Sequence, residues 1–133
     1  MAGDRVTGAS VPELVLSSSA RRAVQTAELV IAELEPRVEL VVERALYEAD
    51  ADDVVEIVRT FGGDATSVMV VGHNPTIHEL AVLLLDDGDV DGRTRLERGF
   101  PTAALAVTAV PAGPWTRLSL GSGTLLALRT PDP

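Results

Sequence analysis

The sequence predicts an α/β domain: a three-layer sandwich in which a largely parallel sheet carries helices on both faces. Two observations favour this class. Short, uncharged apolar runs typical of buried strands alternate along the chain with longer segments whose apolar residues recur at helical spacing. The chain has 133 residues, of which 46% are hydrophobic, and this is enough for one domain with a substantial core. We therefore expect residues 1–133 to form a single domain.

The first third of the chain predicts a strand, a helix and a second strand. Residues 14–16 form a short apolar run that fits a buried strand. Residues 20–34 carry apolar side chains at helical spacing, with Ser18 or Ser19 as the N-cap, and Pro36 ends the helix. Residues 38–42 are rich in β-branched side chains and predict the second strand.

The middle of the chain predicts two more helices around one strong strand. Asp53 and Glu56 have the spacing of a capping box, which indicates a helix through Thr60 that glycines 62 and 63 end. Residues 68–71 are uncharged and mostly β-branched, so they form the strongest predicted strand. Asn74 is expected to cap the following helix, with Pro75 at its first position. After an acidic loop, residues 103–110 and 124–128 predict two final strands.

Composition and charge exclude several classes of function. The formal net charge is −9 and all eleven basic residues are Arg, which argues against a nucleic acid or an anionic membrane as partner. The sequence contains no Cys, so a disulfide scaffold and a thiolate nucleophile are excluded. The apolar runs are too short to span a bilayer, and the first residues lack the apolar region of a signal peptide. We expect a cytoplasmic protein that needs no metal or organic cofactor.

Two junctions between a predicted strand and a predicted helix carry cationic side chains. Arg22 follows the strand at 14–16, and His73 follows the strand at 68–71. Parallel sheets bind ligands at the carboxyl ends of their strands, and helix N-termini attract anions. Arg22 and His73 therefore predict part of a phosphate site. Ser17 is a candidate phosphate donor with a structural role as the alternative, and Asn74 is a candidate ligand contact with helix capping as the alternative.

These junctions resemble motifs of the histidine phosphatase superfamily, in particular its small SixA-type phosphohistidine phosphatases. Residues 14–28 resemble the second motif of the family, and Val70 to Pro75 resemble the third. Residues 100–107 and the C-terminal stretch from Trp115 to Gly123 are similar to the late part of the family. The resemblance runs from about Pro12 to the C-terminus, with Ser19 standing where the family usually has Pro.

The resemblance implies roles for individual residues. Arg22 matches the phosphate clamp, and its planar guanidinium suits that role. His73 matches a second, charge-stabilising histidine, which must be protonated to help. Glu48 lies on a loop comparable to the one that carries a proton donor in some branches, with an exposed loop carboxylate as the alternative.

The sequence departs from the family at its beginning. Family members begin with a strand that ends in Arg-His-Gly, whose His is the nucleophile, and no Arg-His dipeptide occurs in this sequence. Two hypotheses follow. The chain belongs to a phosphatase that acts on phosphohistidine or a phosphomonoester and is shortened at its N-terminus, or it is a non-catalytic module that binds phosphate or a phosphoprotein. Since the absent strand is central in the family, we expect its neighbours to have unpaired edges, which self-association would cover.

Two other features have simpler interpretations. His78 lies five residues after His73, about 140° around the helix, so we expect an exposed helical residue and not a replacement nucleophile. Residues 87–92 match the opening of a calcium loop, but Arg98 stands where a bidentate Glu is needed. We therefore expect a solvated acidic loop.

Overall fold

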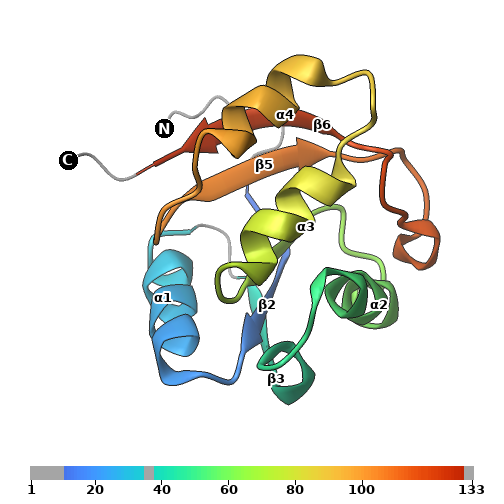
Figure 1. Cartoon of the computed structure of the whole chain (residues 1–133). Coiled ribbons are helices and arrows are strands. Elements are labelled where there is room, and N and C mark those ends of the chain that lie inside the picture. The colour runs from blue at the N-terminus through green and yellow to red at the C-terminus, as the bar shows by residue number, and fades with distance from the viewer. Residues whose placement is uncertain (1–10, 35–37, 131–133) are drawn as a thin grey trace.

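A computed structural model describes residues 11–34 and 38–130 of the chain (Figure 1). Its elements, in chain order, are β2 (Leu14–Ser18), α1 (Arg21–Ala32), β3 (Glu39–Glu43), the 3-10 turn η2 (Arg44–Leu46), α2 (Ala51–Phe61), β4 (Val68–Val71), α3 (Thr76–Leu84), α4 (Val90–Glu97), β5 (Leu105–Ala109), the 3-10 turn η3 (Trp115–Arg117) and β6 (Thr124–Arg129). None of the helices in this described part is long and apolar enough to cross a membrane.

The first three strands form a parallel sheet with β2 at its centre. The strand order is β3-β2-β4, and β2 pairs in parallel with both neighbours. All five residues of β2 are buried, as expected for an uncharged strand flanked on both edges. In the register, Ser18 lies opposite Glu43 of β3 and Ser17 lies opposite Val71 of β4. The carboxyl ends of the three strands therefore meet at one edge of the sheet.

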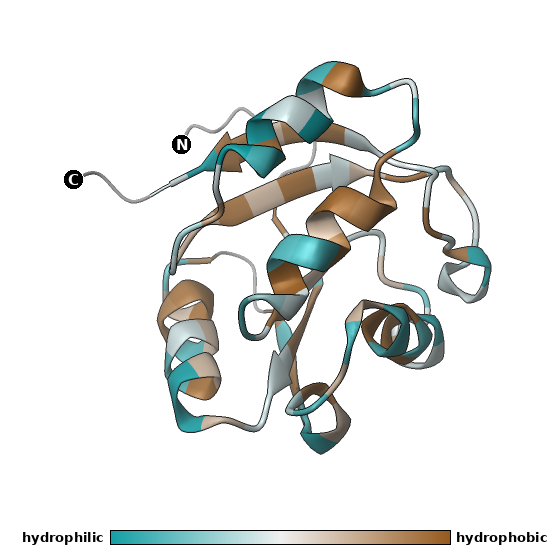
Figure 2. Cartoon of the chain, in the orientation of Figure 1, coloured by the Kyte–Doolittle hydropathy of each residue, from teal (hydrophilic) through white to brown (hydrophobic). Residues whose placement is uncertain are grey.

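Helices cover both faces of this sheet. Successive side chains of a strand point to opposite faces, so β2 contributes to two cores. Val15 packs in one cluster with Ala23 and Ala27 of α1, whereas Leu16 packs in another with Val54 of α2. Figure 1 shows α1 and α2 on opposite sides of β2. Both helices mix hydrophobic and hydrophilic residues along their length, as expected for helices with one face on the core (Figure 2). The prediction of a three-layer α/β sandwich is confirmed.

The last two strands form a separate antiparallel pair. β5 pairs with β6, and α3 and α4 pack on this pair through a cluster of Ala81, Leu85, Leu96, Phe100 and Leu125. Within the described ranges, β4 has a strand partner only on its β2 side, and no ladder joins it to β5 or β6. The unpaired edges expected beside the absent family strand would be edges of this kind. Self-association over it stays a prediction.

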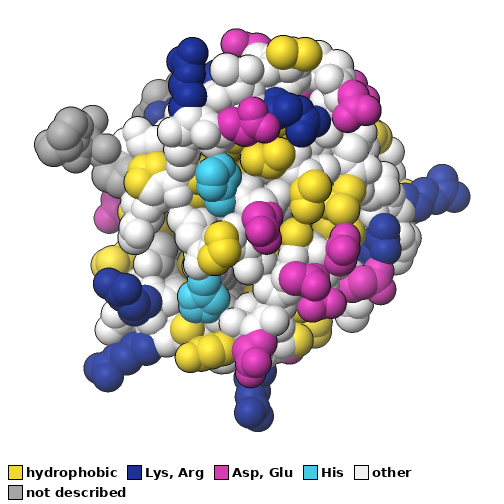
Figure 3. Space-filling view, viewed as in Figure 1, with side chains coloured by type: hydrophobic (Ala, Val, Ile, Leu, Met, Phe, Trp, Pro, Cys, Tyr) yellow, Lys and Arg dark blue, Asp and Glu magenta, His cyan; other side chains and the backbone are white. Residues whose placement is uncertain are grey.

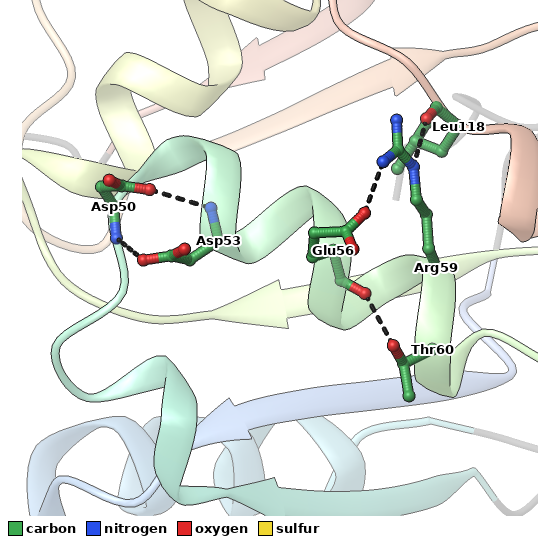
Figure 4. A network of polar contacts seen from close by, with 6 residues as sticks. All are labelled: Asp50, Asp53, Glu56, Arg59, Thr60 and Leu118. Carbon is green, nitrogen blue, oxygen red and sulfur yellow. Dashed lines mark hydrogen bonds and ion pairs between the residues drawn. The ribbon is translucent and has the colours of Figure 1, made fainter.

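The expected position of the α2 capping box was wrong. The capping box of α2 lies one turn earlier than expected: the Asp50 carboxylate accepts from the Asp53 amide at 2.8 Å, and the Asp53 carboxylate accepts from the Asp50 amide at 3.2 Å (Figure 4). Glu56 instead pairs with Arg59 on the helix surface, where Nε of Arg59 donates to the Leu118 carbonyl at 2.8 Å. The sequence offered two Asp/Glu pairs at the same spacing, and the start of α2 selected the first.

The expected acidic loop contains a helix. α4 begins after Asp89, whose side chain accepts a hydrogen bond from the Gly92 amide at 3.0 Å and caps the helix. The second carboxylate oxygen of Asp89 accepts from the Leu125 amide at 2.8 Å, which ties the helix to β6. The strand expected from residue 103 begins only at Leu105, because Ala103 has a positive φ of 69° and belongs to the preceding turn.

Candidate functional site

The edge where the parallel strands end carries the candidate site. β2 ends at Ser18 and α1 begins at Arg21, while β4 ends at Val71 and is followed by Gly72 and His73. The register places these two junctions side by side, because Ser17 and Val71 are opposite each other in adjacent strands. The two sequence segments with cationic side chains therefore converge at the edge where parallel sheets bind ligands.

A hydrogen bond joins the two junctions directly. The Ser18 hydroxyl oxygen lies 2.8 Å from Nε2 of His73, and the Ser18 side chain is fully buried. The same oxygen accepts from the Ala20 amide at 3.2 Å, just before α1. Ser18 thereby fixes the position of the His73 ring relative to the start of α1. The expected N-cap at Ser18 or Ser19 was wrong, since Ala20 is the N-cap of α1 and no side-chain bond caps it. The contact of Ser18 with His73 was not predicted, because its partner is 55 residues away.

The His73 ring is held on a second side by an aromatic contact. The Tyr47 ring lies 5.7 Å from it, between centroids, at a tilt of 58°. Tyr47 follows η2, which starts directly at the end of β3, so this contact brings the third strand end to the site. Tyr47 is 57% exposed and His73 is half-buried, which leaves the imidazole accessible from solvent.

The N-terminus of α1 adds a positive field. The backbone N–H groups of its first turn have no helical acceptors, no side chain caps them, and the first turn contains no acidic residue. Arg22 lies exposed in this turn. Because Arg22 is only four residues after Ser18, their Cα atoms are at most about 14 Å apart, within reach for a long side chain. The amides of the first turn of α1, Arg22 and His73 thus belong to two neighbouring strand-to-helix junctions.

The other residues predicted for the site lie in different positions. Ser17 is fully buried, and its hydroxyl donates to the Ser18 carbonyl at 2.9 Å, which corresponds to the structural alternative. Glu48 is exposed on the loop after η2, next to Tyr47, which corresponds to the loop-carboxylate alternative. No contact of Glu48 with His73 is found among the described residues.

Asn74 does not cap α3, so that expectation was wrong. The helix begins at Thr76 with Pro75 before it, and Asn74 makes no capping bond. Instead its Nδ2 donates to the Phe100 carbonyl at 2.8 Å, which ties the junction after β4 to the segment before β5. Asn74 is thus a positioning residue for the loop that carries His73.

His78 is half-buried, where an exposed residue was expected. Its Nε2 lies 2.7 Å from the Leu96 carbonyl oxygen, and its ring stacks on Phe100 with the centroids 5.5 Å apart. These contacts attach α3 to α4 and hold the imidazole away from the strand ends. The calcium hypothesis finds no support at Asp89 either, since both of its carboxylate oxygens accept from backbone amides. Those bonds lower the pKa of Asp89, and the bond from the Leu125 amide has a larger effect than the bond from the Gly92 amide.

The chain has sequence relatives among known proteins. No family model matches the chain. The sequence is 38% identical over 120 residues to an uncharacterized protein of Mycobacterium leprae (strain TN), covering 90% of this chain and 71% of that protein. It is 34% identical over 121 residues to an uncharacterized protein of Mycobacterium tuberculosis (strain H37Rv), covering 90% of this chain and 73% of that protein.

Two solved structures share the fold, and each is of a putative phosphohistidine phosphatase SixA. The one from Nakamurella multipartitia has a TM-score of 0.77 and 25% identity, covering 92% of this chain and 72% of that chain. The one from Agrobacterium tumefaciens has a TM-score of 0.69 and 27% identity, covering 91% and 69%. The chain therefore shares the fold of these two putative SixA proteins. By its sequence, the chain belongs to the same family as the mycobacterial proteins.

Proposed function

We propose that this chain forms the phosphate-holding part of a SixA-type phosphatase that acts on phosphohistidine in a protein or on a phosphomonoester. The observation that supports the proposal is the bond between Ser18 and His73, which links the imidazole to the residues just before α1, the helix that carries Arg22. The two structural neighbours, each described as a putative phosphohistidine phosphatase SixA, support the same substrate class.

Each group has a defined task in this proposal. The guanidinium of Arg22 donates two hydrogen bonds to phosphoryl oxygens, and His73 donates one from a ring N–H. The amides of the first turn of α1 complete the ring of donors. These groups stabilise the charge that develops on the equatorial oxygens during phosphoryl transfer, which is where such a site gains most of its rate.

Cleavage also needs a nucleophile, which we propose comes from a segment outside residues 1–133. In that step an imidazole nitrogen of the enzyme attacks phosphorus and the bond to the leaving group breaks. Water then hydrolyses the enzyme phosphohistidine to inorganic phosphate and restores the imidazole. The sequence has two histidines: His73 is engaged by Ser18, and His78 is packed on Phe100. This observation also favours the second candidate function, phosphate or phosphoprotein binding without cleavage, for residues 1–133 alone.

Binding of inorganic phosphate tests the site. We expect Arg22→Ala and His73→Ala each to weaken binding by at least about tenfold, since a hydrogen bond to a charged group contributes about 1.5–3 kcal/mol. Arg117→Ala is the matched control, because it removes the same charge from η3, which packs on α2 far along the chain from the site. Titration calorimetry at low salt measures all four proteins. Equal loss in the control, or none in Arg22→Ala, would contradict the proposal.

Two further measurements separate the two functions. Residues 1–133 are expected to bind a phosphohistidine peptide without releasing phosphate. The intact mass of the protein from its own cells would be 14.0 kDa if the binding module is the natural product. A larger mass, with hydrolysis recovered in the longer form, is the outcome expected for the phosphatase.

A further inference from the structure

An open groove lies beside the candidate site, between α2 and α3. Its volume is about 560 Å³, and its walls come from the first turn of α2, the exposed side of α3 and the last residue of α4. Four carboxylates line it: Asp50, Asp52, Glu79 and Glu97. The floor is apolar, with Val82 half-buried and Leu83 46% exposed. Figure 3 shows acidic and hydrophobic side chains gathered on the face that carries both histidines.

The ionisable residues that line the groove are mostly acidic. Four of them are carboxylates, none is an Arg, and His78 is the one lining residue that can become cationic. The carboxylates are also too dispersed to share a metal ion: nowhere in residues 11–34 and 38–130 do three or more His, Asp or Glu side chains gather closely enough to hold one. A spread negative field over an apolar floor matches a ligand that is itself extended, cationic and partly apolar.

The groove and the site around His73 are connected by short stretches of chain. Tyr47, which contacts the His73 ring, lies three residues before Asp50, a distance of at most about 10 Å along the chain. On the other wall, α3 starts three residues after His73, and the Thr76 hydroxyl donates to the Ala49 carbonyl at 3.2 Å. This bond joins the two walls at the end nearest the site. The end of the groove that these two walls form therefore lies near His73 along the chain, where the surface beside a phosphorylated side chain can reach it.

Resting on the proposed function, we propose that this groove docks a basic, amphipathic segment of the phosphorylated protein substrate. Lys or Arg side chains of the segment pair with Glu79, Asp52 and Glu97, and its apolar side chains contact Leu83. The groove thus selects a protein substrate with a cationic surface beside its phosphorylated residue.

The overall charge of the chain gives a reason for such a surface. With a formal net charge of −9, the protein repels a phosphoryl anion at long range, and the few donors around His73 act only at contact. A basic segment on the substrate reverses the sign of the long-range interaction and steers the substrate to the face that carries the site. A free small phosphate has no group that provides this attraction.

The test uses short synthetic peptides and two matched triple variants. The peptides combine a flank rich in Arg and Leu, or in Glu and Leu, with a central histidine or a stable phosphonate analogue of phosphohistidine. The groove variant is Asp52→Asn, Glu79→Gln and Glu97→Gln, which leaves the capping residue Asp50 in place. The control variant is Glu28→Gln, Glu33→Gln and Asp64→Asn, three exposed carboxylates outside the groove. Both variants change the net charge equally.

The expected result separates docking from phosphate binding. The peptide with the basic flank binds the wild-type protein even without phosphate, and its affinity falls about tenfold in the groove variant but little in the control. Added salt reduces this affinity in the wild type. His73→Ala removes only the gain that the phosphonate provides. Equal binding of basic and acidic flanks, or equal loss in both triple variants, would overturn the docking proposal. If the phosphonate adds no affinity for the wild-type protein, the proposed function is contradicted, whereas the comparison of basic and acidic flanks still decides the docking proposal.

Discussion

The Ser18 hydroxyl lies 2.8 Å from Nε2 of His73 and joins the ends of two parallel strands that are 55 residues apart in sequence. Both groups belong to junctions that the sequence marks separately. The contact joins these two junctions into one candidate site, because it holds the imidazole next to the residues that precede α1.

Replacing Ser18 with Ala is expected to lower both stability and phosphate affinity. The change leaves Nε2 of His73 and the Ala20 amide without this oxygen, so the free energy of unfolding should fall by about 1–3 kcal/mol. Phosphate affinity should fall several-fold because the imidazole is no longer oriented. Chemical denaturation and calorimetry measure the two effects. Ser17→Ala is the matched control: it is equally buried but donates only to the Ser18 carbonyl, so its phosphate affinity should stay near wild type.

Replacing Asn74 with Asp separates a tether from a helix cap. Asp is as good a helix cap as Asn, so capping would predict little change. The structure instead shows Nδ2 donating to the Phe100 carbonyl, and a carboxylate cannot donate there. We expect Asn74→Asp to cost more stability than Asn74→Ala, because it places an anion against a carbonyl oxygen, and to weaken phosphate binding. Thermal unfolding of both variants measures the two losses of stability. An Asn74→Asp variant as stable as the wild type would contradict the role of the Asn74–Phe100 hydrogen bond.

Replacing Asp89 with Asn is expected to change how stability depends on pH. Amides of Leu125 and Gly92 hold the pKa of Asp89 below its usual range in the folded protein, so the unfolded state takes up a proton first as the pH falls. The stability due to this carboxylate is therefore present above the unfolded pKa and is lost as the pH falls through the folded one.

Unfolding near neutral pH and in acid gives the measurement. The wild type should exceed Asp89→Asn in stability near neutral pH, and the difference should shrink in acid. Asp91→Asn, which removes an exposed carboxylate from the first turn of the same helix, is the control. A difference between the wild type and Asp89→Asn that is constant with pH would contradict the assignment.

Local patterns in the sequence predicted the strands and the start of the candidate site well. Val68–Val71 and Leu14–Leu16 are strands, and the helices on both faces follow from the spacing of residues such as Ala23 and Ala27. Arg22 and His73 could be named because a cation after a buried strand is a local signal. Helix ends were predicted less well: Asp50 and Asp53 took the capping box, and Asp89 began a helix in a stretch expected to be a loop.

The sequence by itself determined the class of fold, the order of its elements and the two junctions that carry Arg22 and His73. These depend on hydrophobic periodicity and on residues near one another in the chain. Only the tertiary structure decided that Ser18 supports His73, that Asn74 reaches Phe100, and that carboxylates of three helices line one groove. Each of these needs side chains from distant segments, and their meeting is set by strand register and helix packing, which no local pattern specifies.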